Sequence, residues 1–220
     1  MIQNIKFEKI KFSDRKLVEE LTKNTFEWGD YINEVFDEWI NQGLFIKAVD
    51  ENGDILGIIH AKIYDDFAWL EGIRVRQDVR KMGIGKKLTE KAIELSNRKI
   101  IRLTVNVKNE PSLALVKSMG FREIDRFYFN MGIKMDFKDI IDTYKLKQSE
   151  NLSFSLKGYV DNWVWYPFDK YNKLFYTNDE TIILNTNPPF VLKGNKLQFE
   201  HISINEKENS EGFIVFELKI

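Results

Sequence analysis

The chain has 220 residues, of which 43% are hydrophobic and 30% are charged, and its formal net charge is -1 at pH 7. This composition is typical of a soluble globular protein, and the length allows one large domain, or one of roughly 140 residues with a smaller one beside it. The near-zero charge argues against nucleic acid as an obligate partner. The absence of cysteine excludes disulfides, thiolate nucleophiles and cysteine-ligated zinc.

The histidines, His60 and His201, are too few for a histidine-rich metal site, so we expect no metal. The first ten residues place charges inside their apolar alternation and contain no continuous apolar run of signal-peptide length. No run elsewhere approaches the length of a membrane span. We therefore expect a cytoplasmic protein with no membrane partner.

The N-terminal part of the chain predicts a strand followed by two helices. Residues 2–12 alternate apolar and charged side chains, as a half-buried strand does. Ser13 can cap a first helix that begins at Asp14, with Leu17 among its inward positions. A second helix follows Asp30 and ends at Gly43, and its apolar positions at helical spacing are Ile32, Val35, Phe36, Trp39 and Ile40. These aromatic residues either fill the core or line an acceptor pocket.

Three antiparallel strands are predicted next. Residues 44–49 and 55–63 are joined through Asn52-Gly53, which suits a tight hairpin turn because both residues tolerate positive φ. A second reversal leads into a strand over residues 67–75. His60 lies in the middle of the second strand, where we expect a hydrogen-bonded histidine of the sheet.

The stretch V-R-Q-D-V-R-K-M-G-I-G, residues 75–85, turns the third strand into a helix over residues 84–97. Glycine at positions 83 and 85 permits positive φ and removes side chains that would keep a ligand from the backbone. The exposed amides and the positive end of the helix suit a phosphate or diphosphate. The basic residues of the loop and the first helical turn have the right charge for this ligand: Arg80, Lys81, Lys86 and Lys87.

Two common phosphate loops do not fit this stretch. A Walker A loop requires Ser or Thr after the lysine, but Lys87 follows Lys86. A dinucleotide fingerprint requires a third glycine where Leu88 stands. The remaining pattern, Arg-x-x-Gly-x-Gly at the start of a helix after a strand, resembles the acetyl-CoA-binding loop of the GNAT acetyltransferase superfamily.

A second motif follows at the expected distance. Residues 100–107 form a β-branched strand for which we expect parallel pairing with the strand over residues 67–75, and a short helix is predicted over residues 111–119. Asn109 is followed eleven residues later by Gly120-Phe121, which resembles the second signature of the GNAT fold. Two closing strands are predicted over residues 121–130 and 132–137. The resemblance covers residues 1–137.

The resemblance implies an α+β fold with a mixed central sheet flanked by helices, and acetyl-CoA as co-substrate. In such a fold the backbone of the strand before the loop binds the pantetheine arm, and amides of the loop bind the diphosphate. Asn109 resembles the family asparagine that contacts the pantetheine side. The residues assigned to the cofactor in this way are Ile73, Val75, Arg80, Lys81, Met82, Gly83, Ile84, Gly85, Lys86, Asn109 and Ser112.

Acyl transfer to an amine also needs a base that removes a proton from the amine. Glu71 is our candidate because it lies on the strand that enters the loop and shares parity with Ile73 and Val75; the alternative is a solvated strand glutamate. The family tyrosine that protonates the departing thiolate is replaced here by Val116. Tyr128 is a possible substitute, or else an interior or rim aromatic residue.

The resemblance therefore implies an N-acetyltransferase that transfers the acetyl group directly to a primary amine of a small molecule, a peptide or a protein. A non-catalytic acyl-CoA-binding or scaffold protein of the same fold is the alternative. Residues 138–150 read as a polar connector, and residues 151–220 as a small antiparallel β domain. This domain could dock on the catalytic domain, form a homodimer, or cover the acceptor site with Trp163, Trp165 and Tyr166; alternatively its aromatic residues fill a small β-sandwich.

Overall fold

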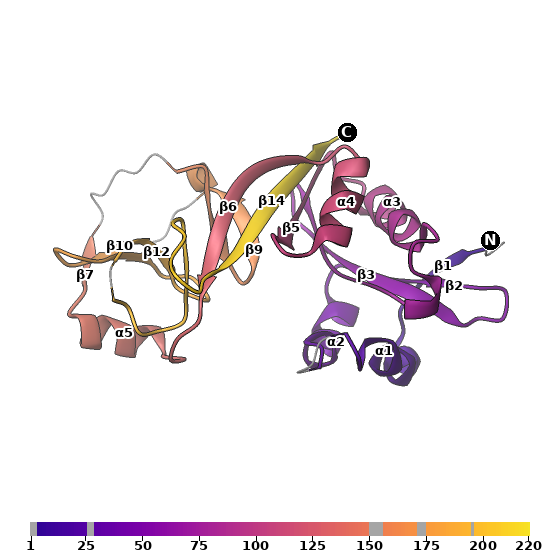
Figure 1. Ribbon diagram of the computed structural model, residues 1–220, viewed down its shortest axis with the longest axis horizontal. Coiled ribbons are helices and arrows are strands. Elements are labelled where there is room, and N and C mark those ends of the chain that lie inside the picture. Colours follow the sequence, from indigo (N-terminus) through magenta and orange to yellow (C-terminus); the bar gives the residue numbers. More distant parts are fainter. Residues whose placement is uncertain (1–3, 26–28, 150–155, 171–174, 195) are drawn as a thin grey trace. The chain divides into compact units, whose positions relative to one another are not determined.

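The computed structural model describes residues 4–25, 29–149, 156–170, 175–194 and 196–220. The chain forms two compact units (Figure 1). The first comprises Met1–Leu103, Ala114–Arg122 and Glu217–Ile220, and the second comprises Thr104–Leu113 and Glu123–Phe216. Strand β5 (Ile100–Asn106), helix α4 (Glu110–Ser118) and strand β14 (Glu211–Lys219) each contribute residues to both units. The domain boundaries proposed from the sequence, at residues 137 and 151, stay a prediction.

The first unit contains the predicted meander. Its strands follow the order β1 (Lys6–Lys9), β2 (Leu44–Val49), β3 (Ile55–Ile63), β4 (Ala68–Val75) and β5. Neighbouring strands from β1 to β4 are antiparallel, and β4 pairs with β5 in parallel. These pairings confirm the hairpin and the expected parallel pair, although of the two turn residues Gly53 has a positive φ, of 85°, and Asn52 does not.

Helices cover both faces of this sheet. Figure 1 shows α1 (Arg15–Thr22) and α2 (Ile32–Asn41) on one side of β3 and α3 (Ile84–Ser96) on the other. Phe36 and Trp39 of α2 are buried against Ile58 of β3, so both aromatic side chains belong to the core. The apolar face of α2 is therefore explained by burial of its periodic side chains.

Two details of α1 differ from the prediction. Leu17 is 53% exposed, so it does not face the core, whereas Val18 is fully buried. No side chain caps α1 among the described residues, and a 3-10 turn at Phe12–Asp14 precedes it. The buried Asp14 instead pairs with Lys47 of β2, with 2.8 Å between Oδ1 and Nζ. Asp14 Oδ2 also accepts the Lys11 amide at 2.9 Å, so this carboxylate joins the 3-10 turn to β2 and does not cap α1.

The second unit is mainly β structure. Its strands follow the order β14, β6 (Arg122–Asn130), β13 (His201–Ser203), β12 (Phe190–Lys193), β11 (Ile182–Leu184), β10 (Phe175–Thr177) and β7 (Lys147–Ser149), and β8 (Gly158–Asp161) pairs with β9 (Val164–Pro167) as a separate hairpin. Trp165 is buried and its indole donates to Asp125, while Trp163 is 38% exposed. This arrangement of one sheet and a hairpin is not the β-sandwich considered above.

The prediction of a strand over residues 132–137 is wrong. Only an isolated parallel bridge joins Ile133 to Phe199, and helix α5 (Phe137–Tyr144) begins where that strand was expected to end. Ile140 of α5 packs with Phe199 and with Ile183 of β11, which explains its helical spacing. No helix in the described ranges is both long and apolar enough to cross a membrane.

Candidate functional site

The glycine loop joins β4 to α3 by way of a short 3-10 turn at Gln77–Val79. Gly83 is the N-cap of α3, and its φ of 82° lies in the left-handed region that favours glycine. The Lys87 amide donates to the Gly83 carbonyl at 3.1 Å and so begins the helical hydrogen-bond series. The amides of residues 84–86 precede it and have no acceptor within the helix.

The surroundings of this helix end favour an anion. No side chain caps α3 among the described residues, and its first turn contains no acidic residue. Arg80, Lys81 and Lys86 are exposed around it. Lys86 reaches Glu90 only at 3.9 Å, and both side chains are more than half exposed, so this pair is weak. Free amides, the helix dipole and nearby cations together suit a phosphate-bearing ligand.

The two glycines of the loop have different roles. A Cβ placed on Gly83 would have no heavy atom within 4 Å, so the space above this residue is open. A Cβ on Gly85 would lie 3.5 Å from Leu115 and 3.7 Å from both Ile73 and Val75. The positive φ at position 83 favours glycine, and the space next to Gly83 is open. Gly85, by contrast, lies where α3 packs closely on β4.

Strand β4 continues beyond its parallel partner. Pairing with β5 ends at Leu70 and Leu103, while pairing with β3 continues as far as Val75 and Gly57. In the described ranges no other strand pairs with this outer edge of β4 after Leu70. Backbone groups on such an edge can bind the amides of an extended ligand as an added strand would.

A β-bulge lies in the same part of β4. Gly72 and Ile73 of β4 stand opposite a single residue of β3, Ile59. Gly72 has a φ of 63°, which is typical of the glycine in such a bulge. The extra residue reverses the alternation of side chains between the two faces of the strand.

The bulge therefore changes the face to which Glu71 belongs. Ile73 and Val75 point toward Gly85 of α3. Glu71 is paired with His60, and Arg74 contacts Asp30, which immediately precedes the α2 region. The inference from parity that grouped Glu71 with Ile73 and Val75 is wrong, because Glu71 lies on the face covered by α1 and α2.

The Glu71 carboxylate is held by two side chains of β3. Its Oε1 lies 2.9 Å from His60 Nδ1 and 3.5 Å from Lys62 Nζ, and the side chain is 15% exposed. This environment is not that of a solvated strand glutamate. A carboxylate that is fixed through one oxygen and remains partly open can take a proton from a bound amine, directly or through water.

Tyr31, Asp30 and Arg74 surround Glu71 but were not singled out by the sequence. Arg74 forms a two-pronged ion pair with Asp30, at 2.6 Å from Nε to Oδ2 and 3.0 Å from Nη2 to Oδ1. Burial raises the pKa of Tyr31 to about 12, against the opposing effect of Arg74, and Glu71 and Asp30 raise it further. Its hydroxyl therefore keeps its proton at neutral pH. A charged residue inside an apolar strand, Arg74, was the one signal for this cluster.

Asn109 and Ser112 are structurally linked. Asn109 Oδ1 accepts a hydrogen bond from the Ser112 amide at 3.2 Å, so Asn109 caps α4. In the part of the chain that the structure describes, no partner is found for the side-chain nitrogen Nδ2 of this exposed residue. Asn109 can therefore serve both the helix and a ligand.

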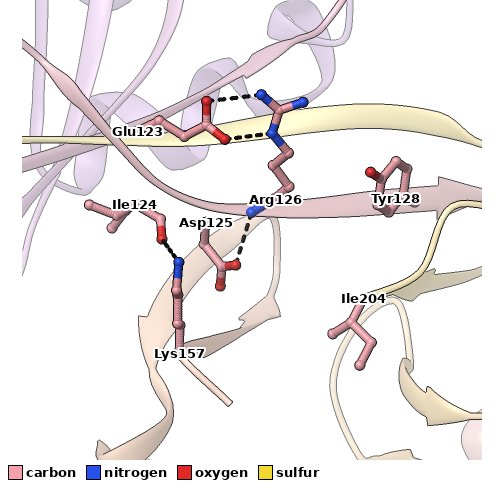
Figure 2. Close-up of a pocket in the computed structure, with 7 residues that line it drawn as sticks. All are labelled: Glu123, Ile124, Asp125, Arg126, Tyr128, Lys157 and Ile204. Atoms are coloured by element: carbon pink, nitrogen blue, oxygen red, sulfur yellow. Dashed lines mark hydrogen bonds and ion pairs between the residues drawn. The ribbon is translucent and has the colours of Figure 1, made fainter.

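Val116 stands at the position of the family tyrosine, and Tyr128 is the proposed substitute for it as the general acid; the two residues lie in different surroundings. Val116 of α4 is 4% exposed and belongs to the core. Tyr128 of β6 lines a pocket of about 400 Å³ in the second unit (Figure 2). Lys157 donates to the Ile124 carbonyl in the same pocket. Tyr128 is thus an aromatic residue at a pocket rim, and its role as an acid stays a prediction.

In the described ranges, no group of three or more His, Asp or Glu side chains is arranged to hold a metal ion. The site described above combines an anion-binding helix end, an open strand edge and a largely buried carboxylate.

Comparison with known proteins agrees with this geometry. Residues 15–121 match the model of the acetyltransferase (GNAT) family. A solved structure from Thermoplasma acidophilum, described as a candidate acetyltransferase, is 16% identical and aligns over 96% of this chain and 91% of its own with a TM-score of 0.62. The ribosomal-protein-S18-alanine N-acetyltransferase from Escherichia coli is 15% identical and aligns over 99% and 94% with a TM-score of 0.53.

A further structure, the NatC complex bound to Gag peptide and CoA, is 23% identical and aligns over 56% of this chain and 88% of that chain with a TM-score of 0.50. These likenesses show a shared fold. Together with the family match, they show that residues 15–121 form a domain of the acetyltransferase (GNAT) family, and they support acyltransferase activity.

Proposed function

We propose that the chain transfers an acetyl group from acetyl-CoA directly to a primary amine. The observation that carries the proposal is the uncapped N-terminus of α3 at the end of a strand whose outer edge is unpaired after Leu70. A diphosphate would bind the amides of residues 84–86, and the pantetheine arm would pair with Ile73 and Val75. The NatC structure, which contains CoA, supports this choice of ligand.

The proposed reaction needs no covalent enzyme intermediate. The amine nitrogen attacks the thioester carbonyl, the new C–N bond forms and the C–S bond breaks. Glu71 takes the proton from the amine, directly or through one water molecule, and the CoA thiolate leaves and takes a proton from solvent or from a nearby hydroxyl. Holding the two substrates together supplies much of the rate enhancement.

The acceptor is a primary amine of a small molecule, a peptide or a protein. Two of the similar structures carry names that refer to a ribosomal protein and to a bound peptide. Peptides with free N-termini therefore belong in the acceptor panel beside polyamines, aminoglycosides and lysine-containing peptides. A cytoplasmic location and pairing with a second copy of the chain remain part of the proposal, to be tested by cell fractionation and by sedimentation.

The decisive experiment is an acceptor panel in which acetyl-CoA turnover is followed by release of free thiol. Binding of CoA is measured separately by calorimetry. We expect turnover with at least one amine, and a loss on the order of a hundredfold in Glu71→Gln with CoA affinity nearly unchanged. CoA binding without transfer to any amine would instead favour the non-catalytic protein, and absence of CoA binding would remove the proposal.

A further inference from the structure

The most constrained side chain beside Glu71 is His60, on the neighbouring strand β3. Its side chain is fully buried. His60 Nε2 lies 2.8 Å from the backbone carbonyl oxygen of Gln42, and Nδ1 lies 2.9 Å from Glu71 Oε1. Both ring nitrogens are thus engaged, one with a backbone acceptor and one with the proposed base.

The chemistry of these partners fixes the protons. A backbone carbonyl can only accept, so Nε2 carries a hydrogen that it donates to Gln42. The contact between Nδ1 and Glu71 then needs a second hydrogen, because two lone pairs would otherwise face each other. We place this hydrogen on Nδ1 of His60, so that Nδ1–H donates to Glu71 Oε1 and Glu71 remains a carboxylate. His60 and Glu71 form a charge-assisted hydrogen bond.

The ring itself cannot turn easily. It stacks on Trp39 with 4.4 Å between ring centroids and 8° between planes, and Phe45 contacts it edge-on at 5.8 Å. Gln42 is the C-cap of α2, and its amide donates to the Glu38 carbonyl, so this residue is held at the helix end. The end of α2 thereby orients His60, and His60 orients the Glu71 carboxylate.

Several other ionisable groups face this pair. Lys62 Nζ lies 3.5 Å from Glu71 Oε1 on the same face of β3. From β4 and the segment before α2, Arg74, Asp30 and Tyr31 form the neighbouring cluster. Lys62 is 21% exposed and only approaches the carboxylate, whereas His60 is buried and within hydrogen-bonding distance. His60 is therefore the group that can define the direction of the carboxylate.

We propose that His60 is a positioning residue for Glu71: it holds Oε1 through Nδ1–H and leaves Oε2 to face the amine. This inference rests on the proposed role of Glu71 as the base. A carboxylate that rotates freely would spend less time in the reactive orientation, and misplacement by about 1 Å can cost on the order of a hundredfold in rate.

Two variants separate positioning from packing. His60→Asn places a side-chain amide nitrogen where Nδ1 lies, so it can still donate a hydrogen bond to Glu71 but loses the hydrogen bond to the Gln42 carbonyl. The side-chain amide nitrogen of His60→Gln reaches the position of Nε2, so this variant keeps the hydrogen bond to the Gln42 carbonyl and loses the one to Glu71. Both remove the ring that stacks on Trp39, so both lose the same packing.

We expect kcat to fall on the order of tenfold to a hundredfold in His60→Gln but by no more than about threefold in His60→Asn, with the KM for acetyl-CoA unchanged in both. Thermal unfolding and calorimetric CoA binding show that each variant is folded. Equal kcat values for the two variants, or a larger loss in His60→Asn, would overturn the proposal.

A measurement without turnover keeps the inference separate from the proposed reaction. The chain has only two histidines, so His201→Gln assigns the ring signals in ¹⁵N NMR spectra. We expect a slowly exchanging Nδ1–H signal of His60 in the wild-type protein and a displaced or absent one in Glu71→Gln, because the carboxylate accepts this hydrogen. An Nδ1–H signal that is the same in both proteins would refute the pair even if acetyl transfer is found, and a changed one supports it even if no acceptor is found.

Discussion

The indole of Trp39 occupies the space directly above Gly72: a Cβ built on Gly72 would lie only 2.5 Å from Cζ3 of the tryptophan. Gly72 is the positive-φ residue of the bulge that places Glu71 on its face of the sheet. The same tryptophan stacks on His60. Helix α2, the bulge and the candidate base therefore depend on one packing contact.

Replacing Gly72 by alanine tests this contact. The new methyl group must displace Trp39, and the residue must also adopt a φ of 63°, so we expect a loss of about 2–4 kcal/mol in unfolding free energy. Guanidinium unfolding measures it. Gly53→Ala is the matched control, because Gly53 has a similar φ of 85° but no heavy atom near its Cβ position. Equal losses in the two variants would show that Trp39 is not a steric constraint.

Replacing Gly83 by aspartate tests the anion site. The carboxylate would stand among the free amides of α3, where it repels a diphosphate and competes for the same hydrogen bonds. We expect the Kd for CoA to rise by at least about tenfold while the melting temperature changes little, since aspartate tolerates the left-handed region and suits an N-cap. Calorimetry measures the Kd.

Gly53→Asp introduces the same charge at a positive-φ glycine in the β2–β3 turn and should leave CoA affinity unchanged. If Gly83→Asp also binds CoA with wild-type affinity, the diphosphate does not lie at this helix end.

The Arg102–Glu217 ion pair lies within the first unit and joins β5 to the C-terminal residues of β14. Arg102 Nη2 and Nε each lie 2.9 Å from Glu217 Oε2, and both side chains are at least 90% buried. Glu217→Ala removes the carboxylate from a buried guanidinium, so we expect a loss of about 3–5 kcal/mol in unfolding free energy. Denaturant unfolding checks this, and the double variant Arg102→Met/Glu217→Leu should recover most of the loss. A single variant as stable as the wild type would contradict the prediction.

The pH dependence of stability should depend on His201. Burial lowers the pKa of His201 from its ordinary value of 6.5, and the adjacent Lys207 lowers it further, against the opposing hydrogen bond to the Phe199 carbonyl. Between the folded-state pKa of His201 and 6.5, the His201 side chain is therefore more protonated in the unfolded chain than in the folded chain. Stability should therefore fall as pH decreases below about 6.5, until the folded-state pKa is passed.

Unfolding free energies measured between pH 5 and pH 8 test whether stability falls as the pH decreases. His201→Gln keeps an acceptor for Lys207 but cannot titrate, so its stability should fall less with acid than that of the wild-type protein. His60 is present in both proteins and cancels in the comparison. Parallel curves would show that His201 does not contribute.

Much of the first unit could be predicted because its signals are local. The apolar run of residues 55–63, the Asn52-Gly53 turn and the glycine loop each depend on residues adjacent in sequence, and the structure has the corresponding hairpin and helix start. Residues 132–137 were misassigned because their alternation over so short a run does not distinguish a strand from the approach to α5.

The sequence by itself determined the order of the elements from β2 to β5 and the chemistry of the loop, because turn signals, glycine conformation and helix dipoles act over a few residues. Only the tertiary structure decided the face on which Glu71 lies, since the bulge at Gly72 depends on pairing with β3. It also decided that His60 lies between the Gln42 carbonyl and the Glu71 carboxylate, because these three residues belong to different elements that meet only through strand pairing and helix packing.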